Sequence, residues 1–285
     1  WYTGLNMTHI RGGYTILEVM IFLAISGLIF VSAAAGVNGR QQRVQYTQSI
    51  RDFEGQMEDV LNDVAAGYYP APTGFECRAL GGGNPRPDFT TAGGTPDEHG
   101  GSDDCISVGK AVLFNLNGNN DADDFALATL VGVRPSIESN SKVAVESTNP
   151  KVAYDNNPGN PFDLTEFKGL RFGLRVTGIY DIAPPYTSYG AIVIASGFDS
   201  SSASIKNGLS ETRLYALTGN LGLTMQQYVD ELDGLNSSSI VRPLQGVEIC
   251  VEYPGDAKKA RIIVGEGGIA SKVRSELDLI SGLCS

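Results

Sequence analysis

The chain has 285 residues, of which 42% are hydrophobic, and its formal net charge is −11. This length suffices for a membrane helix and one globular domain of ordinary size. A negative exterior repels nucleic acid and anionic lipid headgroups, so the composition argues against a nucleic-acid-binding protein. The small basic cluster at residues 258–261 (KKAR) is too short to change that expectation.

The first feature along the chain is an apolar run. From Ile16 to Val37 almost every residue is apolar, and Glu18 is the only charged one. About 20 residues at a rise of about 1.5 Å each span a hydrocarbon core of about 30 Å. The run therefore predicts one transmembrane helix that begins at Ile16 and ends at Val37. Glu18 is anomalous there, because a carboxylate deep in a bilayer costs about 2.5–3.5 kcal/mol on insertion scales.

The segment that leads into this run is residues 11–18 (RGGYTILE). Together with the apolar run it resembles the class III leader of type IV prepilins and of type II secretion pseudopilins. The resemblance implies cleavage by prepilin peptidase between Gly13 and Tyr14, on the cytoplasmic side, and N-methylation of Tyr14. It also implies that Glu18 acts in assembly by neutralising the terminal amine of a neighbouring subunit. Such an amine, with a pKa of about 8, and a carboxylate stabilise each other in a low-dielectric helix bundle.

Other kinds of N-terminal segment are less consistent with these residues. An ordinary signal anchor with a chance acidic residue is the main alternative. A cleaved secretory signal fits poorly, because the run exceeds the usual ~7–15 residues and no A-x-A site lies near its beginning. We expect translation to start at Met7, and we expect the C-terminal domain to lie outside the cytoplasm. Large domains are translocated across the membrane largely regardless of charge, so the arginines that follow the span do not argue against this orientation.

After the span the sequence becomes amphipathic, from Arg40 to Gly67. Apolar residues recur at steps of three and four, as in a helix with one buried face (Tyr46, Ile50, Phe53, Met57, Val60 and Val64). Because no proline occurs before Pro70, we expect one helix of roughly 50 residues that ends at Gly67. Its apolar stripe needs a partner, which we expect to be a sheet, with a free coiled coil as the alternative.

The remainder predicts a loop followed by strands. Residues 74–104 are rich in glycine, proline and aspartate and are expected to form a loop. Strands are expected at Ile106–Leu116, Phe125–Val133, Leu170–Ile179, Ala191–Ala195, Arg213–Leu217, Val247–Tyr253 and Ala260–Val264. Short helices are expected at Thr224–Leu232 and Ala270–Ile280. The fold class is therefore α+β, a long N-terminal helix packed on an antiparallel sheet. The expected divisions are a leader at 1–13, the helix at 14–67 (14–39 being its transmembrane and assembly half) and a globular head at 68–285.

The four cysteines suit two disulfides on the oxidising side of a membrane, since their number is even and no C-x-x-C is present. Three connectivities are possible. We favour Cys77–Cys105 and Cys250–Cys284, because each pair closes one local segment; this arrangement also resembles the disulfide-bounded C-terminal loop of many pilins. Metal ligation and four buried thiols are the alternatives.

Catalytic and metal motifs are weak. Oxygen-bearing side chains alternate from Asn115 to Asp123, but an EF-hand would need glycine at its sixth position and glutamate at its twelfth, where Asn120 and Ala126 stand. A polar hairpin is the better interpretation, with calcium as the alternative. The sequence offers no nucleophile–base pair and no G-x-S-x-G, so we expect no enzyme activity, cofactor or metal.

The resemblance implies a structural function. We expect a subunit of a type IV pilus-like filament, anchored in the membrane and displayed at the cell surface after assembly. Its expected partners are other pilin subunits, prepilin peptidase, the pilus assembly platform and the membrane, but not nucleic acid. A contact that repeats without closing generates an open helical filament. The alternatives are a type II secretion pseudopilin, a minor tip pilin with an adhesive role, a membrane-tethered enzyme and a tethered binding protein that never assembles.

Overall fold

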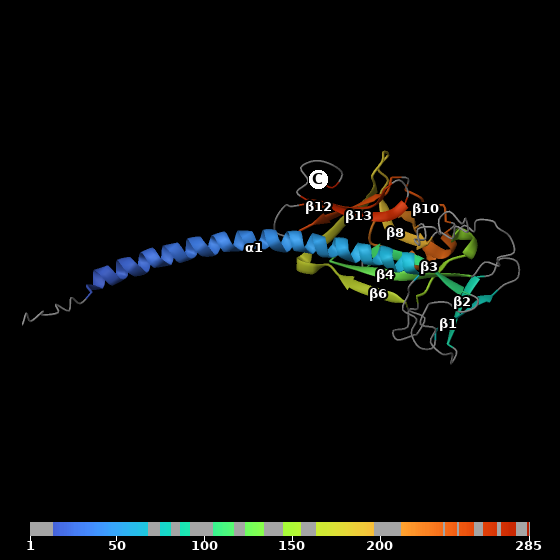
Figure 1. Ribbon diagram of the computed structural model, residues 1–285, viewed down its shortest axis with the longest axis horizontal. Coiled ribbons are helices and arrows are strands. Elements are labelled where there is room, and N and C mark those ends of the chain that lie inside the picture. The colour runs from blue at the N-terminus through green and yellow to red at the C-terminus, as the bar shows by residue number, and fades with distance from the viewer. Residues whose placement is uncertain are drawn as a thin grey trace, which may run out of the picture. The chain divides into compact units, whose positions relative to one another are not determined.

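The computed structural model describes residues 14–67, 75–80, 86–91, 105–116, 123–133, 145–154, 164–196, 212–235, 237–243, 245–253, 259–266, 269–277 and 284, with only the backbone of 34–40, 75–76, 78–80, 86, 88–91, 266 and 269–271 (Figure 1). Two compact units are present, Trp1–Gln45 and Tyr46–Ser285. The described elements include an N-terminal helix with an apolar first part and a domain built on an antiparallel sheet. The fold class is accordingly α+β.

Helix α1 comprises Ile16–Ala66. Thr15 precedes its first turn, and the Thr15 hydroxyl accepts a hydrogen bond from the backbone N–H of Glu18 at 3.3 Å. This satisfies one of the donors that a helix N-terminus leaves without an intrahelical partner. At the other end Gly67 has a φ of 67°, and its N–H donates to the carbonyl of Val64 at 3.1 Å. A left-handed glycine of this kind is a common helix terminator.

The second unit is organised by one sheet. Its strands within the described residues are β3 (Cys105–Phe114), β4 (Asp124–Val133), β5 (Lys151–Val152), β6 (Thr165–Gly169), β7 (Arg175–Asp181), β8 (Tyr189–Ser196), β9 (Thr212–Thr218), β10 (Ile240–Val241), β11 (Val247–Glu252), β12 (Lys259–Glu266) and β13 (Ile269–Glu276). The main order is β5-β4-β3-β8-β9-β13-β12-β11-β7, while β6 pairs with β4 and β10 with β9. All pairings are antiparallel.

The second part of α1 supplies the centre of the core. The residues expected to form its apolar stripe are all buried there (Tyr46, Ile50, Phe53, Met57, Val60 and Val64). Phe53 packs edge-to-face on Phe114 of β3, with ring centroids 6.1 Å apart, and lies 5.6 Å from the ring of Phe125 in β4. Tyr46 meets Tyr253 in the same way at 6.0 Å. Ile249 of β11 and Ile262 of β12 belong to the same cluster, so α1 contacts strands from distant parts of the chain.

A second layer covers the opposite face of β3 and β8. In β8, Ile192 and Ile194 belong to the cluster around α1, whereas Val193 belongs to a cluster on the other face. Helix α2 (Met225–Leu232) packs there through Tyr228 and Leu232, after a capping box formed by Thr224 and Gln227. Because both faces of these strands are buried, they appear in the sequence as continuous apolar runs rather than alternating ones.

The sequence prediction for the last strand of the sheet is wrong. The predicted helix Ala270–Ile280 is strand β13 over Ile269–Glu276, which pairs with β12. Val273 and Leu277 both pack on the main core, and a spacing of four residues places two side chains on one face of a helix or of a strand. The spacing therefore could not distinguish the two, and pairing with β12 decided for the strand.

The predicted loop 74–104 also contains regular structure. Strands β1 (Phe75–Leu80) and β2 (Arg86–Thr91) pair as an antiparallel hairpin within it. The predicted strand Leu170–Ile179 begins late, because a short 3₁₀ turn, η2 (Arg171–Gly173), precedes β7. Two further short helical turns, η1 (Val145–Thr148) and η4 (Asp233–Leu235), complete the described elements. Strands β5, β6 and β10 were not predicted, since they are short or carry few apolar residues.

One buried charge joins α1 to the sheet. The side chain of Lys110 in β3 is only 2% exposed, and its Nζ lies 2.7 Å from Oδ2 of Asp63 in α1. Oε1 of Glu166 in β6 is 3.8 Å from the same nitrogen. Removing one partner from a buried ion pair leaves a charge that is neither hydrated nor compensated, which destabilises strongly.

The first prediction follows from this contact. Substitution Asp63→Asn should lower the free energy of unfolding by about 1–3 kcal/mol, because Glu166 compensates only part of the buried charge. Urea denaturation of the full chain in detergent measures the effect. Asp59→Asn, an exposed carboxylate on the same helix, is the matched control and should change stability by less than about 0.5 kcal/mol. Equal effects of the two substitutions would contradict the importance of the pair.

Candidate functional site

The predicted processing site lies at the beginning of the described chain. Gly13 is outside the described residues, so the structure does not bear on it. Tyr14, the predicted first residue of the processed chain, is 82% exposed. Thr15 caps α1, and Glu18 occupies its first turn. Within the described part of the chain, the Glu18 carboxylate has no hydrogen-bond or ion-pair partner.

The apolar segment after Tyr14 is the candidate membrane span. The window Ile16–Ala33 has a mean hydropathy of 2.4, and none of it is buried within the molecule. Its exposed side chains include Phe22, Leu28 and Phe30, exposed by 69%, 71% and 75%. The predicted far end, Val37, lies where only the backbone is described. A contiguous exposed apolar surface of this kind marks contact with a membrane or another protein.

The cysteines pair as Cys77–Cys105 and Cys250–Cys284, which is the connectivity favoured from the sequence. Cys77 on β1 and Cys105 on β3 have Cα atoms 5.9 Å apart, and both are buried. This bridge attaches the β1–β2 hairpin to the main sheet. Two disulfides indicate an oxidising environment outside the cytoplasm.

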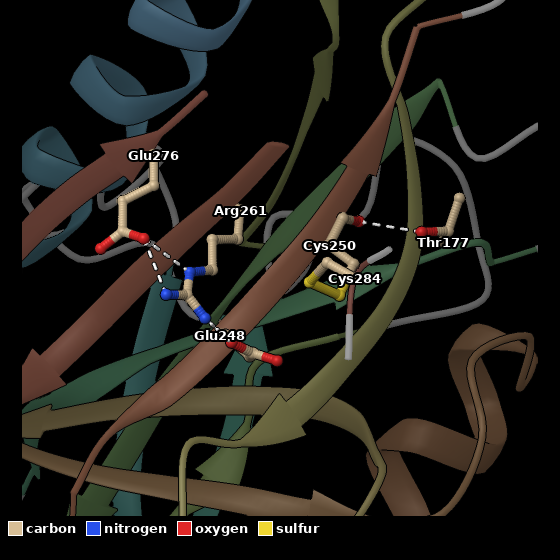
Figure 2. Close-up of a disulfide and its surroundings, with 6 residues drawn as sticks. All are labelled: Thr177, Glu248, Cys250, Arg261, Glu276 and Cys284. Atoms are coloured by element: carbon tan, nitrogen blue, oxygen red, sulfur yellow. Dashed lines mark hydrogen bonds and ion pairs between the residues drawn. A yellow bond between two sulfur atoms is a disulfide. The ribbon is translucent and has the colours of Figure 1, made fainter. Parts of the chain in front are cut away.

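The second disulfide lies on β11 beside a charged group (Figure 2). The carbonyl of Cys250 accepts a hydrogen bond from the Thr177 hydroxyl of β7 at 3.4 Å. On the other side, Arg261 donates to Glu248 at 2.9 Å and to Glu276 at 2.7 Å, so it joins three neighbouring strands. A hydrogen bond to Glu276 raises the pKa of Arg261. Burial partly opposes this rise, and the hydrogen bond to Glu248 adds to it.

Within the described part of the chain, one group of possible metal ligands is found, and it includes this disulfide. Ligand atoms of Glu248, Cys250 and Cys284 lie within 4.8 Å of one another. Both sulfurs are in the disulfide, however, and a disulfide sulfur is not the thiolate that binds metals. Glu248 is also occupied by Arg261. The predicted alternative calcium segment, Asn115 to Asp123, falls largely on residues 117–122, outside the described residues.

Polar clusters that the sequence analysis did not find stabilise the head. The Tyr215 hydroxyl donates to Glu146 at 3.1 Å and accepts from Arg242 at 2.9 Å, while Arg242 also pairs with Glu146. Burial alone would raise the pKa of Glu146, but a backbone hydrogen bond and Arg242 lower it below its ordinary value. Burial and the hydrogen bond to Asp181 raise the pKa of the Tyr189 hydroxyl, which keeps that hydroxyl a donor.

A cleft of about 520 Å³ lies beside β7. Residues 175–180 of that strand form one wall, and residues 188–189 and 219–221 form much of the rest. These positions are far apart in the sequence and belong to no motif, so sequence analysis could not find the cleft. It is a separate feature from the apolar span and the cysteines.

Comparison with known proteins returned no relative: no family model, no curated protein and no solved structure matches the chain.

The second prediction concerns pH. The pKa of Glu146 lies below the ordinary value of 4.5, as does that of Glu166, whose burial is outweighed by Lys168 and Lys110. A carboxylate with a depressed folded-state pKa stabilises the protein above its unfolded-state pKa, and this stabilisation is lost as the pH falls through the folded-state value. The free energy of unfolding should thus decline as the pH falls below 4.5.

Substitution of Arg242 tests the origin of that pH dependence. Arg242→Gln removes the charge beside Glu146 and should make the decline shallower, whereas Arg274→Gln, at a side chain 61% exposed, should leave it unchanged. Urea denaturation at a series of pH values measures both slopes. Parallel profiles for the two variants would contradict the assignment to Glu146.

The third prediction concerns the second disulfide. The double variant Cys250→Ala/Cys284→Ala should lose about 2–4 kcal/mol of unfolding free energy, because the bridge restricts the unfolded chain over a separation of 34 residues. Non-reducing peptide mapping and urea denaturation, each with and without reductant, measure the pairing and the loss. The double variant Cys77→Ala/Cys105→Ala removes the other bridge and is the matched comparison. A peptide that links Cys77 to Cys250 or Cys284 would refute the pairing.

Proposed function

We propose that this chain is a prepilin-like subunit, cleaved between Gly13 and Tyr14, that assembles into a type IV pilus-like filament through its apolar N-terminal helix. One observation carries the proposal: the segment Ile16–Ala33 is exposed throughout and strongly apolar, with Glu18 as its one charge, and it begins within the prepilin-like residues 11–18. The segment requires a cover that the described part of the chain does not supply. In the proposed cycle, lipid covers it before assembly and the helices of other subunits cover it afterwards.

Glu18 distinguishes an assembly helix from a simple anchor. The position of Glu18 in the first turn of α1 explains part of its presence, since an acidic group there interacts favourably with the helix dipole, by about 0.3–1 kcal/mol. A carboxylate at the centre of a bilayer costs about 2.5–3.5 kcal/mol, so the dipole alone offsets only a small part of that when the helix is buried in apolar surroundings. A positive terminal amine at Tyr14 of a neighbouring subunit offers the missing compensation. Glu18 has no partner of its own among the described residues.

The disulfide-linked head fits the extracytoplasmic side of this arrangement. Both bridges lie in the second unit, and disulfides persist in oxidising compartments. The proposed subunit therefore has its head outside the cytoplasm and belongs to the membrane before assembly and to the cell surface afterwards. Prepilin peptidase, an assembly platform and further pilin subunits are its proposed partners.

A minor pilin at the filament tip is a second candidate function. The cleft beside β7 favours it, because a repeating structural subunit needs no ligand cleft in its head. A type II secretion pseudopilin shares the leader, the apolar helix and the head. Mass spectrometry of purified filaments separates these candidates by the abundance of this chain and the identity of its neighbours.

The fourth prediction tests assembly. Glu18→Leu should leave membrane levels unchanged, because it makes the helix more apolar, but filament yield should fall at least about tenfold. Loss of about 1.4 kcal/mol at each subunit contact lowers its equilibrium constant tenfold. Sheared filaments are quantified by immunoblot and compared with the membrane fraction. Glu58→Gln, an exposed carboxylate outside the apolar span, is the matched control and should assemble normally.

Processing is checked in the same strains. Gly13→Val should abolish maturation, because the residue before the cut must be small, and N-terminal sequencing should then find no chain that begins at Tyr14. Normal filaments from Glu18→Leu would remove the assembly role of the carboxylate. Normal maturation of Gly13→Val would remove the leader assignment and favour an ordinary signal anchor.

A further inference from the structure

Polar side chains from separate elements line the cleft beside β7. Tyr180 comes from β7, Ser188 from the end of the β7–β8 connection, Asn220 from the segment after β9, and Glu252 from β11. Asn115 follows β3 and completes this group, called here the cleft cluster. Tyr180, Ser188, Glu252 and Asn115 are half-buried, and Asn220 is exposed.

The side chains of the cleft cluster make no hydrogen bond or ion pair with the part of the protein that the structure describes. This contrasts with other half-buried polar residues of the domain, such as Glu146 and Arg261, which are joined to two partners each. Buried and half-buried polar groups in folded proteins are normally hydrogen-bonded to protein or water. Five groups without protein partners on one concave surface leave donors and acceptors free for a ligand.

The charges of the cleft favour a neutral ligand. Arg175 and Glu252 line it together and lie directly opposite each other in the β7–β11 pairing, so their charges cancel. The chain as a whole carries a net charge of −11, which repels anions. Amide, hydroxyl and carboxylate groups together offer both donors and acceptors to a ligand that has many hydroxyl groups.

The position of Tyr180 adds an aromatic surface. A Cβ placed on Gly178 would lie 2.6 Å from Cε2 and 2.7 Å from the hydroxyl oxygen of Tyr180, so the ring lies directly over the glycine. Any larger residue at Gly178 would displace the ring. The volume of about 520 Å³ falls within the range of roughly 300–1,000 Å³ that is typical of small-molecule sites.

We propose that the cleft cluster binds a neutral, polyhydroxylated ligand, namely a sugar residue of an uncharged glycan. The side chains supply hydrogen bonds to its hydroxyl groups, and the ring of Tyr180 supplies contact with its C–H surface. The site lies entirely in the second unit, so it is independent of assembly through the apolar helix.

An extended peptide added to β7 is the rival occupant, and the pairing of the strand argues against it. Tyr180 already forms a bridge with Ser188, and the N–H of Asp181 donates to the carbonyl of Thr187 at 2.9 Å. The chain itself thus occupies one end of the β7 edge. The remaining edge is short, whereas β-strand addition depends on a continuous row of main-chain hydrogen bonds.

The fifth prediction is the binding test. The full chain, in a zwitterionic detergent without a sugar headgroup, is mixed with D-glucose, D-galactose, D-mannose or N-acetyl-D-glucosamine at millimolar concentration. Saturation-transfer-difference NMR should show binding of at least one of these neutral sugars. Glu252→Gln and Asn220→Ala should each weaken that binding, Glu252→Gln by about tenfold or more because hydrogen bonds to charged groups are the stronger ones.

Two further variants separate a site from a general surface effect. Gly178→Ala displaces the ring of Tyr180 without removing a polar group of the cluster, and should also weaken binding. Tyr186→Phe and Glu58→Gln, exposed residues outside the cleft lining, are the controls and should bind as the unmodified chain does. Signals from none of the four sugars, or signals that the cleft variants leave unchanged, would overturn the proposal. If an added peptide instead protected the backbone amides of β7 and none of the sugars bound, the peptide would be established as the occupant.

Discussion

The burial of one helix stripe in the sheet is the contact on which the rest of the head depends. Between Tyr46 and Val64, α1 places seven apolar side chains against strands from both halves of the sheet order. Each such side chain contributes about 1.5–3 kcal/mol when fully buried. Without the helix, one face of β3, β8, β11 and β12 would be exposed apolar surface. The helix is therefore part of the core of the domain, and the residues that carry the apolar span belong to the same helix.

Polar contacts then fix how the covered sheet is arranged. Lys110 brings a charge into the interior where α1 crosses β3, and Arg261 joins β11, β12 and β13 beside the second disulfide (Figure 2). Ser275 donates to Glu54 of α1 through both its backbone N–H, at 3.1 Å, and its hydroxyl, at 2.9 Å. Among the described residues of β13, Ile269 alone pairs with β9, and further along the strand Ser275 has the carboxylate of Glu54 as its acceptor. Nonspecific burial could not select these pairings, whereas hydrogen-bond geometry can.

The two units present opposite physical demands. The first displays an apolar surface with one carboxylate and finds no cover for it within the described residues, while the second has a complete core, two disulfides and paired charges. The apolar surface of the first unit is stable only where a membrane or other apolar surface covers it. The proposed insertion into a membrane and subsequent polymerisation would meet that demand. The cleft beside β7 is lined by neither the apolar helix nor the cysteines, so the proposed ligand binding is independent of both.

Local pattern was sufficient where one physical requirement dominated the sequence. The stripe from Tyr46 to Val64 indicated a helix with a buried face, and the apolar run after Thr15 indicated a segment that needs cover; the cysteine spacing favoured the local pairings that the structure has. Tertiary structure decided the conformation where a local pattern suits both a helix and a strand. It also decided which residues meet where the sequence shows no pattern. The spacing of Val273 and Leu277 suits a helix and a strand equally, and only pairing with β12 made it a strand. Lys110, the Glu146–Tyr215–Arg242 cluster and the cleft beside β7 were invisible in the sequence, because their members come from distant segments that only the folded chain brings together.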